Sequence, residues 1–155
     1  MADSKCQREA EVWIREVWLP AKFGQTFAKK RLVLEPGGQF EFDAVSSDAL
    51  IAVSISTCGG VTNGGKKATP KLNKIRSDAL FLLLADVGRR MIVFSCAKMY
   101  ALCEAEIRAR RFPRRIEILL AQVPSELEAA LVEARLAAAR EVSPGTSTAI
   151  QPLCQ

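Results

Sequence analysis

Two short runs of alternating apolar and polar residues lie next to each other in the first third of the chain. They are FEFDAV (residues 40–45) and LIAVSIST (residues 50–57), and the polar segment SSDA separates them. Alternation with a period of two is typical of a half-buried β-strand, and a short segment rich in Ser and Asp is typical of a tight turn. The pattern predicts a β-hairpin, whose apolar face needs another layer to cover it.

Helical and extended patterns flank this hairpin in a regular order. Residues 3–19 carry apolar side chains at helical spacing, with Pro20 as the expected end, and residues 31–35 form an aliphatic run. The later predicted elements are a helix over 71–87, a strand over 90–95, a helix over 97–111, a strand over 115–123 and a helix over 124–142. This order predicts one α/β domain over residues 1–142, a mixed sheet with helices on both sides, and a flexible tail over 143–155.

The composition excludes several kinds of chemistry. The 155 residues include no histidine, which removes Ser-His-Asp and Cys-His catalysis and histidine zinc sites. The five cysteines are scattered without C-x-x-C spacing, which argues against a zinc site or a disulfide framework and favours a reducing compartment. No apolar run is long enough to cross a membrane and the N-terminus lacks a signal-peptide pattern, so we expect a cytoplasmic protein with no membrane partner.

The positive charge is moderate and clustered. The formal net charge is +5, which is compatible with a nucleic-acid partner but does not require one. The clusters are Lys29–Arg31, Lys66 and Lys67 with Lys71, Lys74 and Arg76 behind them, Arg89 and Arg90, and RARRFPRR over residues 108–115. Each cluster alone is typical of solvated surface, whereas four of them in one small domain favour a polyanionic partner.

The hairpin pattern also predicts which side chains share a face. If the turn pairs Val45 with Leu50, Asp43 lies opposite Ala52, and alternation then places Ser54 and Ser56 on the face of Asp43. The opposite, core face is expected to carry Phe42, Val53 and Ile55. The polar side chains of both strands are therefore expected to meet on one side.

The order helix-β-β-β-helix-β, with FDAV and IAVSIS as the hairpin strands, resembles the core of the PD-(D/E)xK nucleases, the restriction endonuclease-like superfamily. The resemblance covers about residues 9–94, and the last α-β-α segment is an extension. It implies a restriction endonuclease-like fold and Mg²⁺- or Mn²⁺-dependent cleavage of DNA. Asp43 matches the family's aspartate, but Ser54 and Ser56 stand where the family has an acidic residue and a lysine. The motif is therefore incomplete.

Other side chains could supply the missing charges. The resemblance implies a glutamate from the first helix as second metal ligand, and the candidates are Glu9, Glu11 and Glu16. Measured against the apolar stripe of Cys6, Ala10, Trp13 and Val17, Glu9 and Glu16 are expected on one flank and Glu11 on the other. We select Glu9 with Asp43 for the metal, Ser54 and Ser56 as supports for water, and Lys71 or Lys74 as the cation.

Each of these assignments has an alternative. Lys74 and Asp78 are four residues apart, so an ordinary helical ion pair explains them as well. The glycine-rich segment 59–65 lacks the spacing of a phosphate-binding loop, and Lys66, Lys67 and Arg76 are interpreted as contacts to a nucleic-acid backbone. Three functions remain open. The first is a metal-dependent nuclease, and the second is a catalytically inactive nucleic-acid-binding or complex-assembly subunit on the same scaffold. The third is a partner-binding protein without nucleic acid, whose helical C-terminal half forms an oligomer interface.

Overall fold

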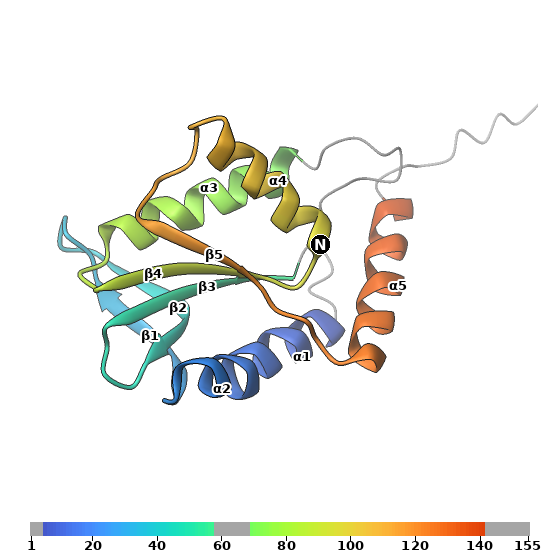
Figure 1. Ribbon diagram of the computed structural model, residues 1–155, viewed down its shortest axis with the longest axis horizontal. Helices are drawn as coiled ribbons and strands as arrows, with labels where there is room; N and C mark the ends of the chain where they lie inside the picture. Colours follow the sequence, from blue (N-terminus) through green and yellow to red (C-terminus); the bar gives the residue numbers. More distant parts are fainter. Residues whose placement is uncertain (1–4, 58–68, 142–155) are drawn as a thin grey trace, which may run out of the picture.

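The computed structural model describes residues 5–57 and 69–141 (Figure 1). Five strands form one sheet and occur in it in chain order: β1 (Phe27–Val33), β2 (Gln39–Ser46), β3 (Ile51–Ser56), β4 (Arg89–Phe94) and β5 (Ile116–Leu120). The helices are α1 (Lys5–Trp13), the π-helical segment η1 (Ile14–Trp18), α2 (Leu19–Phe23), α3 (Thr69–Leu84), α4 (Ala97–Arg108) and α5 (Ser125–Glu141). The predicted order of helices and strands is confirmed.

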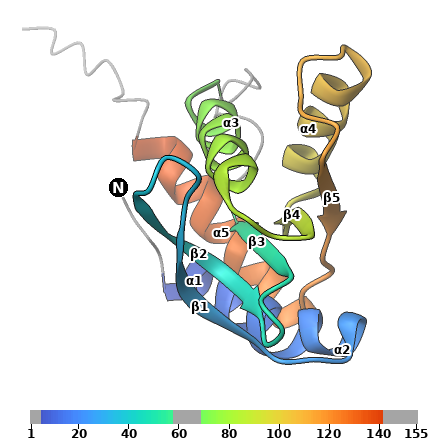
Figure 2. The same ribbon diagram turned by 90° about the vertical axis from the view of Figure 1, so that its left-hand side faces the viewer.

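The sheet is mixed, as predicted. The pairs β1–β2 and β2–β3 are antiparallel, whereas β3–β4 and β4–β5 are parallel. In Figures 1 and 2, α3 and α4 lie on one face of the sheet, and α1 with α2 lies on the other. Parallel strands joined by helices need cover on both faces, which explains why all six residues of the central strand β3 are buried.

Two apolar clusters fill the space between these layers. The cluster under α3 and α4 includes Phe42, Ala52, Leu82, Ile92 and Phe94, and the cluster over α1 and α2 includes Ile14, Leu19, Val53, Ile55 and Val93. Helix α5 packs beside α1, where Leu131 is fully buried. It is also tied to the sheet, because Arg135 donates hydrogen bonds to the carbonyl of Thr57 and to the hydroxyl of Ser95.

The first helical region departs from the prediction. Pro20 does not end it: the helix continues through α2 to Gly24, whose φ of +69° closes it. Pro20 lies in the first turn after the π-helical segment, where a missing N–H is tolerated. The π turn also rotates the later side chains, so Ile14 is buried while Val17, expected in the core, is 51% exposed.

The first strand also starts and ends earlier than the predicted residues 31–35. It begins at Phe27, four residues before the predicted Arg31, and includes the whole basic cluster Lys29–Arg31. Those three side chains are exposed because β1 is an edge strand with little cover, so the hydrophobic pattern hid it. None of the described helices is long and apolar enough to span a membrane. The predicted tail over 143–155 lies outside the described residues.

Candidate functional site

Asp43 lies at an irregularity of β2. On the side of β1, Ala28 is opposite Val45 and Lys30 is opposite Phe42, so three steps along β2 match two along β1. This extra residue is a β-bulge at the position of Asp43, and a bulge redirects the side chains next to it. It also breaks the predicted alternation: Phe42 packs in the cluster under α3 and α4, not on the face of Val53.

The bulge turns the Asp43 carboxylate toward the backbone of β3. Its Oδ2 accepts a hydrogen bond of 2.8 Å from the N–H of Ile55, just beyond the last paired residues, Ala44 and Val53. At the other end of the same strand pair, the Ser46 hydroxyl accepts a bond of 3.0 Å from the N–H of Ile51. Side chains of β2 therefore accept hydrogen bonds from backbone N–H groups of β3 at the two ends of the strand pairing.

The surroundings of Asp43 disfavour its charged form. Burial raises its pKa above the ordinary value, the hydrogen bond from Ile55 opposes this, and the nearby carboxylates of Glu11 and Asp78 raise it further. Lys74 acts in the opposite direction and lowers the pKa. The helices on both faces of the sheet thus contribute charges to the environment of this one carboxyl.

The hairpin register differs from the prediction by two residues. Val45 pairs with Ala52 rather than with Leu50, because residues 47–50 form a longer turn in which Asp48 accepts bonds from the Ser46 hydroxyl and the Leu50 N–H. A shift of two leaves the faces unchanged. The paired residues end at Ala44 and Val53, and Asp43 contacts β3 through the N–H of Ile55. The predicted neighbourhood of Asp43 and Ser54 stays a prediction.

Ser54 and Ser56 are enclosed. Their exposures are 4% and 8%, and alternation from Ala52 places them under α3 and α4. The half-buried strand that the alternation of residues 50–57 predicts is wrong for β3, since all six of its residues are buried.

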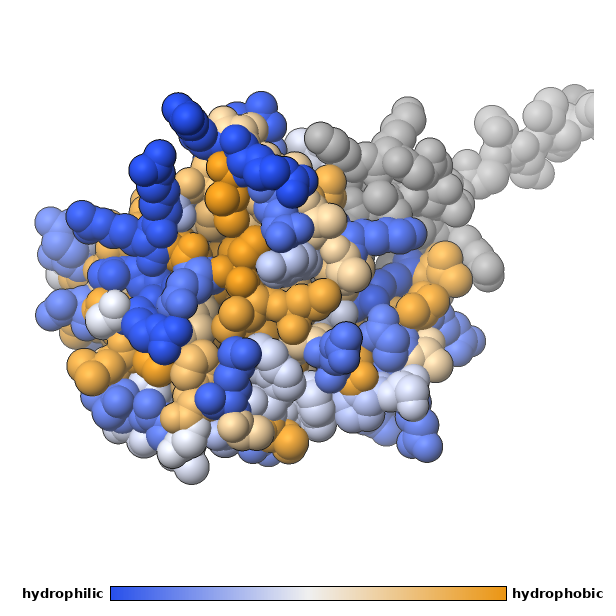
Figure 3. All heavy atoms as spheres, viewed as in Figure 1, coloured by the Kyte–Doolittle hydropathy of each residue, from blue (hydrophilic) through white to orange (hydrophobic). Residues whose placement is uncertain are grey.

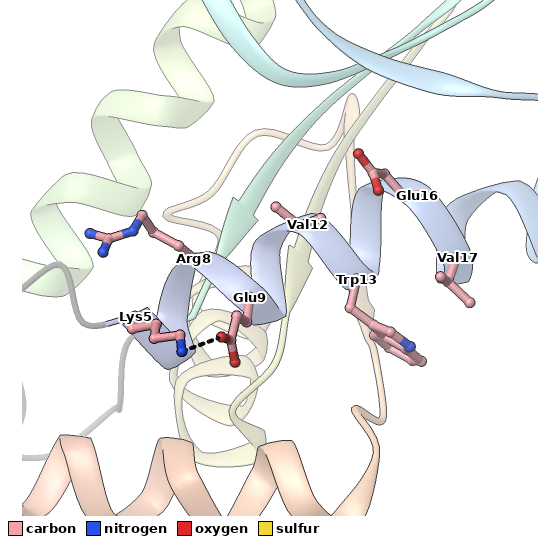
Figure 4. Close-up of a pocket in the computed structure, with 7 residues that line it drawn as sticks. All are labelled: Lys5, Arg8, Glu9, Val12, Trp13, Glu16 and Val17. Atoms are coloured by element: carbon pink, nitrogen blue, oxygen red, sulfur yellow. Dashed lines mark ion pairs between the residues drawn. The ribbon is translucent and has the colours of Figure 1, made fainter.

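The first helix brings Glu11 toward Asp43. Glu11 accepts a 2.8 Å bond from Arg15, whose guanidinium also donates to the Asp43 carbonyl, and it lies 3.4 Å from the amine of Lys29. Glu9 instead lies 3.7 Å from Lys5 at the rim of a shallow groove on α1. Glu9 and Glu16 both line this groove whereas Glu11 does not, so the predicted flanks are confirmed. Figure 4 shows that Glu9 points toward α5.

The lysine candidates lie on α3. Lys74 forms a 3.0 Å ion pair with Asp78, as the alternative interpretation expected. Burial is the main reason why the pKa of Asp78 is raised, and Lys74 lowers it. Lys71 is half-buried at the start of the same helix. The structure therefore places Lys74 near Asp43, but with a carboxylate partner of its own.

The described residues do not fit a Mg²⁺ site. Over residues 5–57 and 69–141, no three Asp, Glu or Cys side chains are arranged to hold a metal ion. Mg²⁺ requires octahedral oxygen ligands, yet the Asp43 carboxylate accepts a bond from Ile55 and Glu11 is paired with two cations. The predicted Glu9–Asp43 pair is not assembled, because Glu9 points toward α5.

A second candidate site is the turn between α4 and β5, residues 108–115, which we call the arginine turn. The end of α4 is closed by backbone bonds from Ala109 to Ala105, from Arg110 to Ile107 and from Arg111 to Glu106. Phe112 is 7% exposed and inserts into the core under α4. The turn is thus anchored at its middle, while the arginines on either side of Phe112 are exposed.

A buried carboxylate fixes the start of this turn. Glu106 is 3% exposed and accepts bonds of 2.7 Å from Arg111 and 2.8 Å from Arg76 of α3. Hydrogen bonds from Arg111 and Arg76 lower the pKa of Glu106 to about 2. Arg76, predicted as a nucleic-acid contact, is therefore also a structural link between α3 and α4.

The other arginines of the turn are free to meet a ligand. Within the part of the chain that the structure describes, Arg108, Arg110, Arg114 and Arg115 have no ion pair. Figure 3 shows hydrophilic side chains projecting at the upper left, where Figure 1 draws α3, α4 and this turn. The density of arginine in the sequence indicated the cluster, but the anchoring by Phe112 and Glu106 was not predictable from it.

In the Lys29–Arg31 cluster of β1, all three side chains are exposed and Lys29 pairs with Glu11. Arg89 pairs with Glu117, and Arg90 donates to the carbonyls of Leu82 and Ala85. Lys66 and Lys67, predicted as nucleic-acid contacts, lie outside the described residues.

Comparison of the chain with protein family models, with curated proteins and with solved structures finds no match in any of the three.

Proposed function

We propose that this protein binds DNA without cleaving it, through contacts from the arginine turn to the phosphate backbone. The scaffold has the helix and strand order of the PD-(D/E)xK nucleases, and the proposal treats it as a nuclease-derived fold that has kept binding and lost the catalytic charges. The observation that carries the proposal is an exposed turn, anchored by Phe112 and Glu106, in which several guanidinium groups have no ion pair within the described residues.

The chemistry of the turn suits a polyanion. Guanidinium groups form bidentate bonds to phosphate and do not lose their charge at any physiological pH. A turn anchored by Phe112 and Glu106 presents these groups without a large loss of backbone freedom on binding. Contacts of this kind fix a protein on the backbone and carry little sequence information.

The backbone of Arg110 supports the same conclusion. Its φ is +60°, a left-handed conformation that closes many helices and that glycine adopts with little strain. A non-glycine residue in this conformation lowers the stability of the fold by about 1 kcal/mol relative to glycine. Strain of this kind is a reason to look for function, and an arginine at the tip of a basic turn offers one.

A salt titration with matched variants tests the proposal. One variant changes Arg108, Arg110 and Arg114 to Gln, and the control changes Lys29, Lys30 and Arg31 to Gln, so both lose three positive charges. We expect the wild-type affinity for duplex DNA to fall linearly with log salt, and the slope to decrease by about one for each phosphate contact removed from the turn. Equal affinity loss in the two variants would contradict the proposal.

A metal-dependent nuclease is the second candidate. The observation in its favour is that Glu11 and Asp78 both raise the pKa of Asp43, since gathered carboxylates are typical of hydrolytic metal sites. A cleavage assay on duplex, single-stranded and branched DNA with Mn²⁺, comparing wild type with Asp43→Asn, tests it. Cleavage by the wild type that the Asn variant lacks would favour the nuclease over the binding protein.

A further inference from the structure

The sheet ends at β5 with backbone groups that point outward. The N–H of Ala121 donates to the carbonyl of Phe94, so alternate residues of β5 bond to β4 and those between them face away. The outward residues are Ile116, Ile118 and Leu120. Pro113 accepts the N–H of Ile116, and in the described part of the chain no strand pairs with the outward groups of the other two.

The two edges of the sheet differ in how well they are protected against pairing with another strand. The β1 edge carries three exposed basic side chains and lies beside the bulge of β2, both of which discourage pairing with another strand. The sequence of β5, IEILL, contains no lysine or proline, and its one charged side chain, Glu117, is paired with Arg89.

The open edge is also apolar. Ile118, Leu119 and Leu120 are each only half-buried. Figure 3 shows hydrophobic atoms across the middle of the molecule, over the region where Figure 1 draws β5. An open strand edge bordered by apolar side chains is a site for adding a further strand.

We propose that the β5 edge pairs with β5 of a second copy of this chain, antiparallel and around a two-fold axis at Ile118. In this register the two Ile118 residues exchange both backbone hydrogen bonds. The carbonyl of Ile116, whose N–H is already used, accepts from the Leu120 N–H of the second copy. The pairing joins two five-stranded sheets into one and uses the same surface on both copies.

Charge favours a second copy over an unrelated strand. The same register places Arg115, exposed and unpaired in the described chain, opposite Ala121 of the second copy. The chain then leads into the first turn of α5, which carries the exposed Glu126 together with Glu128, and Glu128 already lies 3.7 Å from Arg135 of its own chain. The basic residue before β5 of one copy thus approaches the segment that leads to the acidic first turn of α5 in the other copy. The two-fold axis produces this pairing of opposite charges twice.

Sedimentation equilibrium of the full chain in the absence of DNA gives the first test. At a protein concentration of about 100 µM, we expect the wild type to be a dimer and Ile118→Pro to be a folded monomer. Proline at 118 removes only an N–H that points away from β4, a position where edge strands accept proline. A monomeric wild type would overturn the proposal, and so would a folded Ile118→Pro variant that remains dimeric.

A cross-link decides the case if the proline variant does not fold. Residues opposite each other in such a pair have Cα atoms about 5.5 Å apart, within the range of a disulfide. Under mild oxidation we expect Ile118→Cys to form a covalent dimer on a non-reducing gel at least 10-fold more than Lys30→Cys, an exposed position on the other edge, or the wild type with its native cysteines. Equal dimer yields in all three would overturn the proposed edge.

Discussion

Asp43 is subject to two opposing influences on its charge. Burial and two neighbouring carboxylates raise its pKa, whereas the hydrogen bond from Ile55 lowers it. We expect Asp43→Ala to be less stable than Asp43→Asn by about 1–3 kcal/mol, because only Asn keeps an acceptor for the buried Ile55 N–H. Urea unfolding of both variants measures this difference. Equal stabilities would mean that the carboxylate is not needed to complete the sheet.

The raised pKa of Asp43 has a consequence for pH dependence. Above the ordinary value of 3.8 the folded chain holds this proton more tightly than the unfolded chain, so the free energy of unfolding falls as pH rises through the window above 3.8. Asp43→Asn has no proton to lose there. We expect its stability relative to the wild type to increase over that window and then level off, which unfolding at a series of pH values would detect.

Glu106 should behave in the opposite way. Its pKa is lowered from 4.5 to about 2 by Arg111 and Arg76, so the stability it supplies is complete above pH 4.5 and is lost as pH falls toward 2. We expect Glu106→Gln to be less stable than the wild type at pH 7 by about 1–3 kcal/mol, with the difference narrowing below pH 4.5. A difference that does not vary with pH would argue against the ion-pair network. Thermal or urea unfolding at pH 3, 5 and 7 compares the two.

Sequence alone placed Asp43 on the first strand of the hairpin but could not assign what its carboxylate does. Alternation predicts which face a side chain takes only while the strand is regular, and the bulge at Asp43 changes its direction toward the backbone of β3. No residue in FEFDAV signals that bulge. For the same reason Phe42 was assigned to the wrong cluster.

At the scale of elements, the order of helices and strands followed from periodicity, and their ends did not. The amphipathic pattern of residues 3–19 located the first helix, but a π turn inside it has no sequence signature and changed which residues are buried. The first strand was missed at its start because an exposed edge strand lacks the apolar alternation by which strands are recognised. Which edge of the sheet is open depends on strand order, which only the structure gives.

Arg110, the left-handed residue that follows α4, allows an effect on stability to be separated from an effect on DNA binding. We expect Arg110→Gly to increase the free energy of unfolding by about 0.5–1 kcal/mol, since glycine adopts a φ of +60° without strain. The same change should weaken DNA binding, because it removes a guanidinium from the arginine turn. Ala49→Gly is the matched control: φ is +58° at Ala49, so stability should rise while DNA binding stays unchanged. A Gly variant at 110 that binds DNA as the wild type does would count against the turn as the contact surface.

At the scale of the whole molecule, the two proposals together predict how the binding surface is arranged. Antiparallel strands are related by a two-fold axis perpendicular to the sheet, so the α4 side of one copy lies on the same face as that of the other. The arginine turns of both copies would therefore point toward the same side of a ten-stranded sheet. One long duplex could contact both turns, and a short one could contact only one.

Comparison of duplex lengths with the monomeric Ile118→Pro variant tests this arrangement. On a duplex of about 30 base pairs we expect the monomer to bind at least 10-fold more weakly than the wild type, because it loses the second, intramolecular contact. Its salt slope should fall to about half, since half of the phosphate contacts remain. On a duplex of about 8 base pairs, which spans only about 27 Å at 3.4 Å per base pair, the affinities should be equal. A loss of the same size on both duplexes would mean that the proline damages the turn itself rather than separating two of them.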